Sequence, residues 1–114
     1  MQTTYLPHQK LIAYQVARDL VLAVVTARIR DAGLRDQALR AAKSAALNTA
    51  EGAGRVSPAD KARAFAIARG EAGECAAAIE IAALCGDASA AAAAEVHRLA
   101  SRLTAMLAPL ARRR

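Results

Sequence analysis

The stretch Asn48-Thr49-Ala50-Glu51-Gly52-Ala53-Gly54-Arg55-Val56-Ser57-Pro58 decides how this chain folds. It interrupts an alanine-rich helical pattern with two glycines, and a helix start signal follows at once. Ser57 suits the N-cap, Pro58 the first helical position and Asp60 the place of a capping-box acid. The flanking segments have the composition of long helices, so the sequence predicts a helical hairpin that turns at Gly52 to Gly54.

Length and composition favour a single all-α domain that spans residues 1–114. Thirty-three residues are alanine, the best helix former, whereas aromatic residues make up only 3%. Because alanine buries little apolar area, a bundle of this composition gains little from its core. Association with further copies of the chain is one remedy, so a homo-oligomer is expected.

Hydrophobic periodicity and the capping residues predict four helices joined by short turns. We expect them at about residues 8–31, 35–51, 58–84 and 88–110, packed as an up-down-up-down antiparallel four-helix bundle. The first helix is apolar around most of its circumference, so it is either central in the bundle or shared with another subunit.

Glycines mark several of these bounds. Gly33 is expected to end the first helix, and Asp36 to start the second. Gly86 is expected to end the third helix, and Asp87 or Ser89 to cap the fourth. Inside the third helix the sequence has two more, which favour a close helix contact: Gly70 and Gly73.

The second helix carries polar residues along a line where a packing seam is usually apolar: Gln37, Arg40, Ser44, Asn48 and Glu51. An antiparallel hairpin would place three pairs opposite each other: Asn48 with Arg63, Arg40 with Glu71, and Gln37 with Glu74. Two interpretations stay open, because such pairs can fix the register of the hairpin or the line can contact a partner directly.

Glu51 is at a helix C-terminus, where the helix dipole disfavours an acid. A compensating cation is therefore expected. Arg55 is the nearest in the sequence, and a neighbouring subunit is a second source.

No pattern typical of catalysis or metal binding is recognisable. Glu95-Val96-His97 has the wrong spacing for a di-metal bundle, no Ser or Cys has an obvious His partner, and phosphate-loop patterns are missing. We therefore predict a protein that is not an enzyme, with no catalytic residues, no metal and no cofactor. With no signal peptide and no long apolar run, a cytoplasmic protein without a membrane partner is expected.

The net charge of +6 comes from sixteen basic residues, mostly arginine, against ten acidic ones. Guanidinium groups suit phosphate, so RNA or DNA is one expected partner, and an arginine-rich coding bias is the other interpretation. Without an aromatic platform for stacking, binding should be phosphate-led and salt-dependent. The predicted nucleic-acid-binding residues are Arg28, Arg30, Arg35, Arg40, Lys43, Arg55 and Arg63. The alternative is a structural or protein-interaction scaffold whose arginines serve solubility.

The residues around the hairpin resemble the signature of a bacterial protein family. They are Gln37, Arg40 to Ala42, Ser44, Asn48 to Gly52, Gly54, Arg55, Ser57, Asp60, Arg63 to Phe65, Ile67, Ala68, Gly70 and Glu74. The chain resembles the four helix bundle protein family over about residues 8–110. That family includes proteins encoded in intervening sequences of large-subunit ribosomal RNA genes and the accessory variability protein of diversity-generating retroelements.

This resemblance implies a homo-pentamer of barrel-like shape. In the retroelement branch it also implies a basic surface for nucleic acid and a reverse transcriptase as partner. The hinge and register residues of the signature are Asn48, Glu51, Gly52, Gly54, Ser57, Asp60 and Glu74. The chain departs from the family pattern where larger residues are usual, at Ala38, Ala45 and Thr49, and at Glu71, where a serine is usual.

Overall fold

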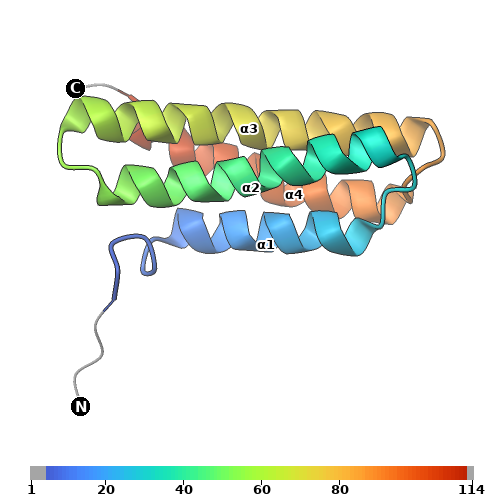
Figure 1. The fold of residues 1–114 in the computed structure, drawn as a ribbon, viewed down its shortest axis with the longest axis horizontal. Coiled ribbons are helices and arrows are strands. Elements are labelled where there is room, and N and C mark those ends of the chain that lie inside the picture. The colour runs from blue at the N-terminus through green and yellow to red at the C-terminus, as the bar shows by residue number, and fades with distance from the viewer. Residues whose placement is uncertain (1–4, 113–114) are drawn as a thin grey trace, which may run out of the picture.

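The computed structural model describes residues 5–112, which form four α-helices and no strand. They are α1 (Ile12–Ala27), α2 (Ala32–Gly54), α3 (Pro58–Leu84) and α4 (Ala90–Leu110). The predicted all-α four-helix bundle is confirmed (Figure 1). Residues 1–4 and two arginines of the basic tail, Arg113 and Arg114, lie outside the described residues.

Consecutive helices run antiparallel and pack around a square (Figure 1). α1 and α3 each pack against both α2 and α4, whereas the diagonal pairs have no Cα atoms within 8 Å of each other, so α1 is not central to the bundle. We call residues 5–19, 44–71 and 100–112 the hairpin half, since it contains the α2–α3 turn and both described ends of the chain. The far half, residues 20–43 and 72–99, contains the other two turns.

Small side chains bring α2 close to its neighbours. The residues that α2 buries are Ala38, Ala41, Ala42, Ala45, Thr49 and Gly52. Larger core side chains come from other helices, among them Leu20 of α1, Ile79 of α3 and Leu103 of α4. Because alanine ends at Cβ, the α2 backbone can approach α3, and these two helices share the most extensive contact in the bundle.

Gly52 lies in the last turn of α2, against the ring of Phe65. A Cβ on Gly52 would lie 2.7 Å from Cε1 and 2.8 Å from Cδ1 of that ring. The prediction that the chain turns at Gly52 to Gly54 is therefore wrong, because both glycines belong to α2 and neither has a positive φ. The chain reverses at Arg55 to Ser57, and the Ser57 hydroxyl accepts a hydrogen bond from the backbone N–H of Asp60 at 3.1 Å.

The first helix is shorter than expected at both ends. Residues before Ile12 form hydrogen-bonded turns, in which the backbone N–H of Leu11 donates to the carbonyl of His8 at 3.0 Å. Arg28 ends α1 by adopting the left-handed conformation, with φ 51°.

The second and fourth helices also differ from the expected bounds. The Asp31 carboxylate accepts from the backbone N–H of Leu34 at 2.9 Å, so α2 begins at Ala32 and Gly33 lies in its first turn instead of ending α1. The Ser89 hydroxyl caps α4, accepting from the backbone N–H of Ala92 at 3.0 Å.

Gly70 and Gly73 do not make the close helix contact expected of them. Both are exposed on α3, and a Cβ at either position would meet nothing within 4 Å. None of the helices within residues 5–112 has the length and the hydropathy of a membrane span.

Replacing Gly52 by alanine should destabilise the bundle, because the new methyl group overlaps the Phe65 ring. We expect Gly52→Ala to lower the free energy of unfolding by about 1–3 kcal/mol in denaturant titrations. Gly54→Ala is the matched control, since a Cβ there meets nothing within 4 Å and alanine is the better helix former. Equal stability of the two variants would contradict this role of Gly52.

Candidate nucleic-acid interface

The structure does not bring the seven predicted nucleic-acid-binding residues together. Arg28, Arg30 and Arg35 lie at the end of the far half, whereas Arg55 and Arg63 lie in the hairpin half. Arg40 and Lys43 lie on the exposed face of α2 between them. The 23 residues of α2 span about 35 Å at 1.5 Å per residue, so the two outer groups belong to different surfaces.

Arg30 joins the two turns of the far half. Its backbone N–H donates to the carbonyl of Asp87 at 2.9 Å, and its guanidinium donates to the carbonyl of Gly86. Its Nε also lies 4.0 Å from the Asp87 carboxylate. Arg35 donates to the carbonyl of Ile29 at 3.2 Å. These two arginines therefore hold the α1–α2 turn in place.

The α3–α4 turn that receives Arg30 has a defined backbone geometry. The backbone N–H of Asp87 donates to the carbonyl of Ala82 at 2.7 Å, and that of Gly86 to Ala83 at 3.1 Å. This is the Schellman motif, in which the residue after the helix is left-handed, and Gly86 has φ 78°.

The polar line of α2 meets α3 through Glu74. Gln37 donates to the Glu74 carboxylate at 3.4 Å, which is the expected pair. Arg40 lies 3.9 Å from the same carboxylate, not from Glu71 as expected, because it is about one helical turn along from Gln37 and reaches the same acid.

The remaining expected pair, Asn48 with Arg63, is not hydrogen bonded. The Asn48 side chain instead donates within its own helix, to the carbonyl of Ser44 at 2.9 Å and to its hydroxyl at 3.1 Å. Asn48 and Arg63 do line the same hollow of about 350 Å³ beside the α2–α3 turn, together with Asp60.

Two basic side chains offset the negative charge at the C-terminus of α2. Arg55 forms an ion pair with Glu51, which raises the pKa of the Arg55 guanidinium above its ordinary value. Lys61 donates to the carbonyls of Gly52 at 3.3 Å and Ala53 at 3.1 Å. Lys61 is not among the cations expected from the sequence, although a lysine in the first turn of the following helix can reach such carbonyls.

Charge is distributed unequally between the two halves of the bundle. The hairpin half carries eight basic and four acidic residues, a net charge of +4. The far half carries six of each and is neutral. The basic residues of the hairpin half are Lys10, Arg18, Arg55, Lys61, Arg63, Arg69, Arg102 and Arg112, and its acidic residues are Asp19, Glu51, Asp60 and Glu71.

Ion pairing follows the same division. Three of the four ion pairs among the described residues lie in the far half: Arg30 with Asp87, Arg40 with Glu74, and Arg98 with Glu95. Exposed pairs of this kind contribute little to stability, but their carboxylates cancel the positive field. Within residues 5–112, seven of the eight basic side chains of the hairpin half have no carboxylate within 4.0 Å, and five of these are arginines: Arg18, Arg63, Arg69, Arg102 and Arg112.

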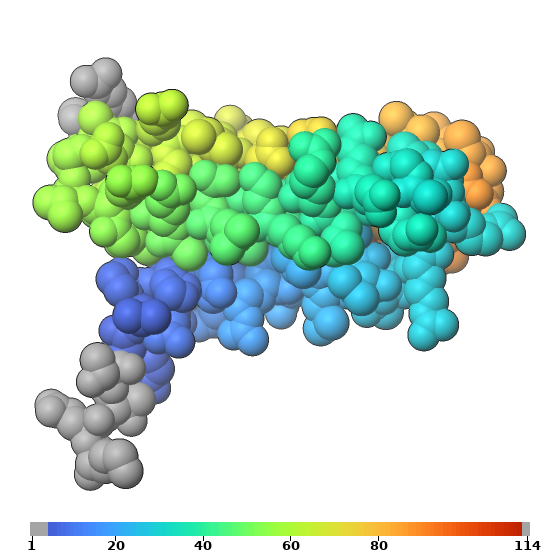
Figure 2. Space-filling model, in the orientation of Figure 1, coloured from blue at the N-terminus to red at the C-terminus, as the bar shows by residue number. Residues whose placement is uncertain are grey.

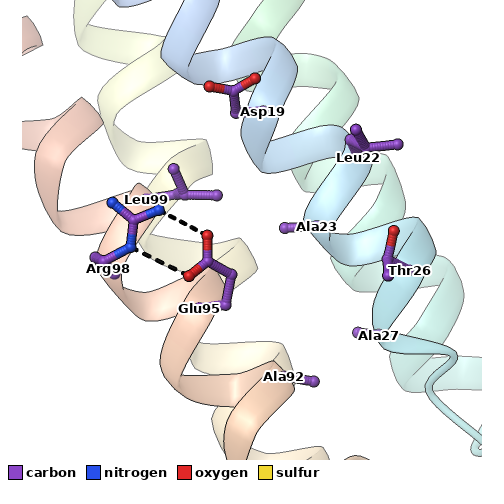
Figure 3. Close-up of a pocket in the computed structure, with 9 residues that line it drawn as sticks. All are labelled: Asp19, Leu22, Ala23, Thr26, Ala27, Ala92, Glu95, Arg98 and Leu99. Atoms are coloured by element: carbon purple, nitrogen blue, oxygen red, sulfur yellow. Dashed lines mark hydrogen bonds and ion pairs between the residues drawn. The ribbon is translucent and has the colours of Figure 1, made fainter.

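A groove lies between α1 and α4 (Figure 3), but the charges of its side chains do not suit a phosphate group. Arg98 is held by Glu95 through two hydrogen bonds of 3.1 and 2.7 Å, and this pairing lowers the pKa of Glu95. Asp19 also lines the groove, so its net charge is negative and it repels phosphate. Small residues also line the groove, among them Ala23 and Ala27.

No metal centre emerges from the described residues, which contain no group of three or more His, Cys, Asp or Glu side chains that could hold a metal ion. Cys75 is fully buried, and burial, with the nearby Glu74 charge, raises the pKa of its thiol to about 12. Cys75 is therefore a core residue that stays protonated at neutral pH.

Comparison with known proteins identifies a family. Residues 9–109 match the family model described as 23S rRNA-intervening sequence protein. The resemblance drawn from the sequence is confirmed to this extent, and the match says nothing of the retroelement branch. A search of curated proteins gives no match to this chain.

Loss of the Arg30 side chain should weaken the fold. We expect Arg30→Gln to lower the free energy of unfolding by about 1 kcal/mol, because the contacts with Gly86 and Asp87 are lost. Arg28→Gln is the control, since Arg28 makes no ion pair within residues 5–112. Denaturant titrations that give both variants the stability of the wild type would contradict the structural role of Arg30.

Proposed function

The chain belongs to the 23S rRNA-intervening sequence protein family, and we propose that it binds nucleic acid through the basic surface of its hairpin half. The unequal distribution of charge carries this proposal. A net charge of +4 in one half and none in the other attracts a polyanion to the hairpin half. The proposed function is binding without catalysis.

The proposed contacts are to phosphate and carry no sequence preference. The five hairpin-half arginines without a carboxylate partner come from three different helices and from the end of α4. Contacts spread in this way can follow a charged backbone but do not form a compact set that reads base edges. RNA is the first ligand to test and DNA the second, because both carry the phosphate groups that guanidinium suits.

Self-association is a further part of the proposal. A groove between α1 and α2, of about 410 Å³, is lined mainly by apolar side chains. Leu22, Val25 and Leu47 line it and are 65%, 55% and 70% exposed, while the core of α2 is alanine. A second copy of the chain would cover these side chains and supply apolar burial that the alanine core lacks. The pentamer implied by the resemblance remains a proposal.

A reverse transcriptase is proposed as a partner for the retroelement setting alone. A reverse-transcriptase gene beside the gene for this chain would support it, and co-purification of the two proteins would test it. A scaffold without a nucleic-acid role is the competing function, and it is supported by the exposed apolar side chains of α1 and α2.

Removing two unpaired arginines from the hairpin half should weaken RNA binding. We expect the double variant Arg63→Gln, Arg69→Gln to reduce the slope of log affinity against log salt by about one per lost phosphate contact. Fluorescence anisotropy with a labelled RNA, titrated between about 50 and 200 mM salt, measures this slope.

The matched control is Arg28→Gln, Lys43→Gln, which removes two unpaired cations from the far half and should change the slope less. Equal effects of the two double variants would contradict the location of the interface. A wild-type protein that binds no RNA or DNA at low salt would refute the function itself.

Placing a charge in the α1–α2 groove should disrupt self-association. Leu47→Glu is expected to lower the molar mass measured by light scattering, because a second copy would have to bury the new carboxylate. Val56→Glu is the control, since Val56 is 93% exposed in the α2–α3 turn and does not line the groove. A wild-type monomer would refute self-association.

A further inference from the structure

The N-terminal segment places an exposed aromatic ring in the hairpin half. Tyr5 is 53% exposed, whereas Phe65 is 5% exposed and Tyr14 is half-buried. No aromatic platform was recognised in the sequence. Folding nevertheless brings the start of α1 to the end of the bundle that carries the net positive charge, and Figure 2 shows the blue segment at the same end as the green α2–α3 turn.

Contacts within the segment hold it in a defined shape. The backbone N–H of Leu6 donates to the Gln9 side chain at 2.8 Å, and that of Gln9 donates to the Leu6 carbonyl at 3.0 Å. The His8 ring packs edge-on against the ring of Tyr14, with centroids 4.7 Å apart, and so fastens the segment to α1.

Lys10 completes the arrangement around Tyr5. Its Nζ lies 4.8 Å from the centroid of the Tyr5 ring, a distance typical of a cation–π contact. One face of the ring is therefore beside an ammonium group. Just over half of the residue remains accessible to solvent. A flat apolar ring beside a cation is the pairing that binds a nucleobase together with its phosphate.

We propose that Tyr5 is a base-stacking residue and that the hairpin half binds single-stranded nucleic acid in preference to duplex. This inference rests on the proposed function. In a duplex the neighbouring base pairs cover the faces of each base, so a protein ring stacks only on an unpaired base. Lys10 and the unpaired arginines of the hairpin half then contact the phosphates of the same strand.

Stacking and phosphate contacts respond differently to salt, and this separates Tyr5 from the arginines. Loss of one stacked base costs about tenfold in affinity. Because a neutral ring releases no counterions, Tyr5→Leu should lower the affinity at every salt concentration and leave the salt slope unchanged. Tyr5→Phe should keep most of the affinity, since it retains the aromatic face.

The test compares a labelled single-stranded RNA with a duplex of the same length, by anisotropy over a salt titration. Wild type and Tyr5→Phe should bind the single strand more tightly, whereas Tyr5→Leu should lose about tenfold on the single strand and little on the duplex. Val56→Ala is the matched control, because it removes exposed apolar surface from the same half without touching an aromatic ring.

The outcomes distinguish this inference from the function on which it rests. Salt-dependent binding with no preference for the single strand, or with Tyr5→Leu equal to Val56→Ala, would overturn the stacking role and leave the proposed function standing. Absence of binding to any nucleic acid at low salt would overturn both.

Discussion

The contact between Gly52 and Phe65 sets the geometry on which the rest of the bundle depends. An aromatic ring occupies the place where any other residue would carry a Cβ, so α2 and α3 meet closely at the turn that joins them. Alanines continue this close approach along α2. The consequence is a narrow core with little large apolar surface, while side chains such as Leu22 and Leu47 remain outside it.

The up-down topology separates charge that is mixed along the sequence. Each helix runs from one half to the other. The hairpin half therefore contains the N-terminal parts of α1 and α3 and the C-terminal parts of α2 and α4. In this way Arg18, Arg63 and Arg102 come to share one half, although they are far apart in the sequence. That half holds only four acidic residues beside its eight basic ones, so its net charge is +4.

Much of the fold could be predicted from local signals, because Ser57, Pro58 and Gly86 act on the backbone within a few residues. The end of α1 could not, since an arginine rarely adopts the left-handed conformation of Arg28. The cluster of Arg28, Arg30 and Arg35 in the sequence suggested an interface. Arg30 and Arg35 instead donate to backbone carbonyls. The Gly86 carbonyl that Arg30 reaches lies 56 residues away in the sequence and is near only in the folded chain.

The most direct measurement of the central claim is a map of backbone amide chemical-shift changes on titration with a short RNA. Preferential binding by the hairpin half predicts changes concentrated in residues 5–19, 44–71 and 100–112, and their loss at high salt. Changes centred on the α1–α2 turn around Arg30, or spread evenly over both halves, would contradict the claim that the fold places its phosphate-binding surface at the hairpin end.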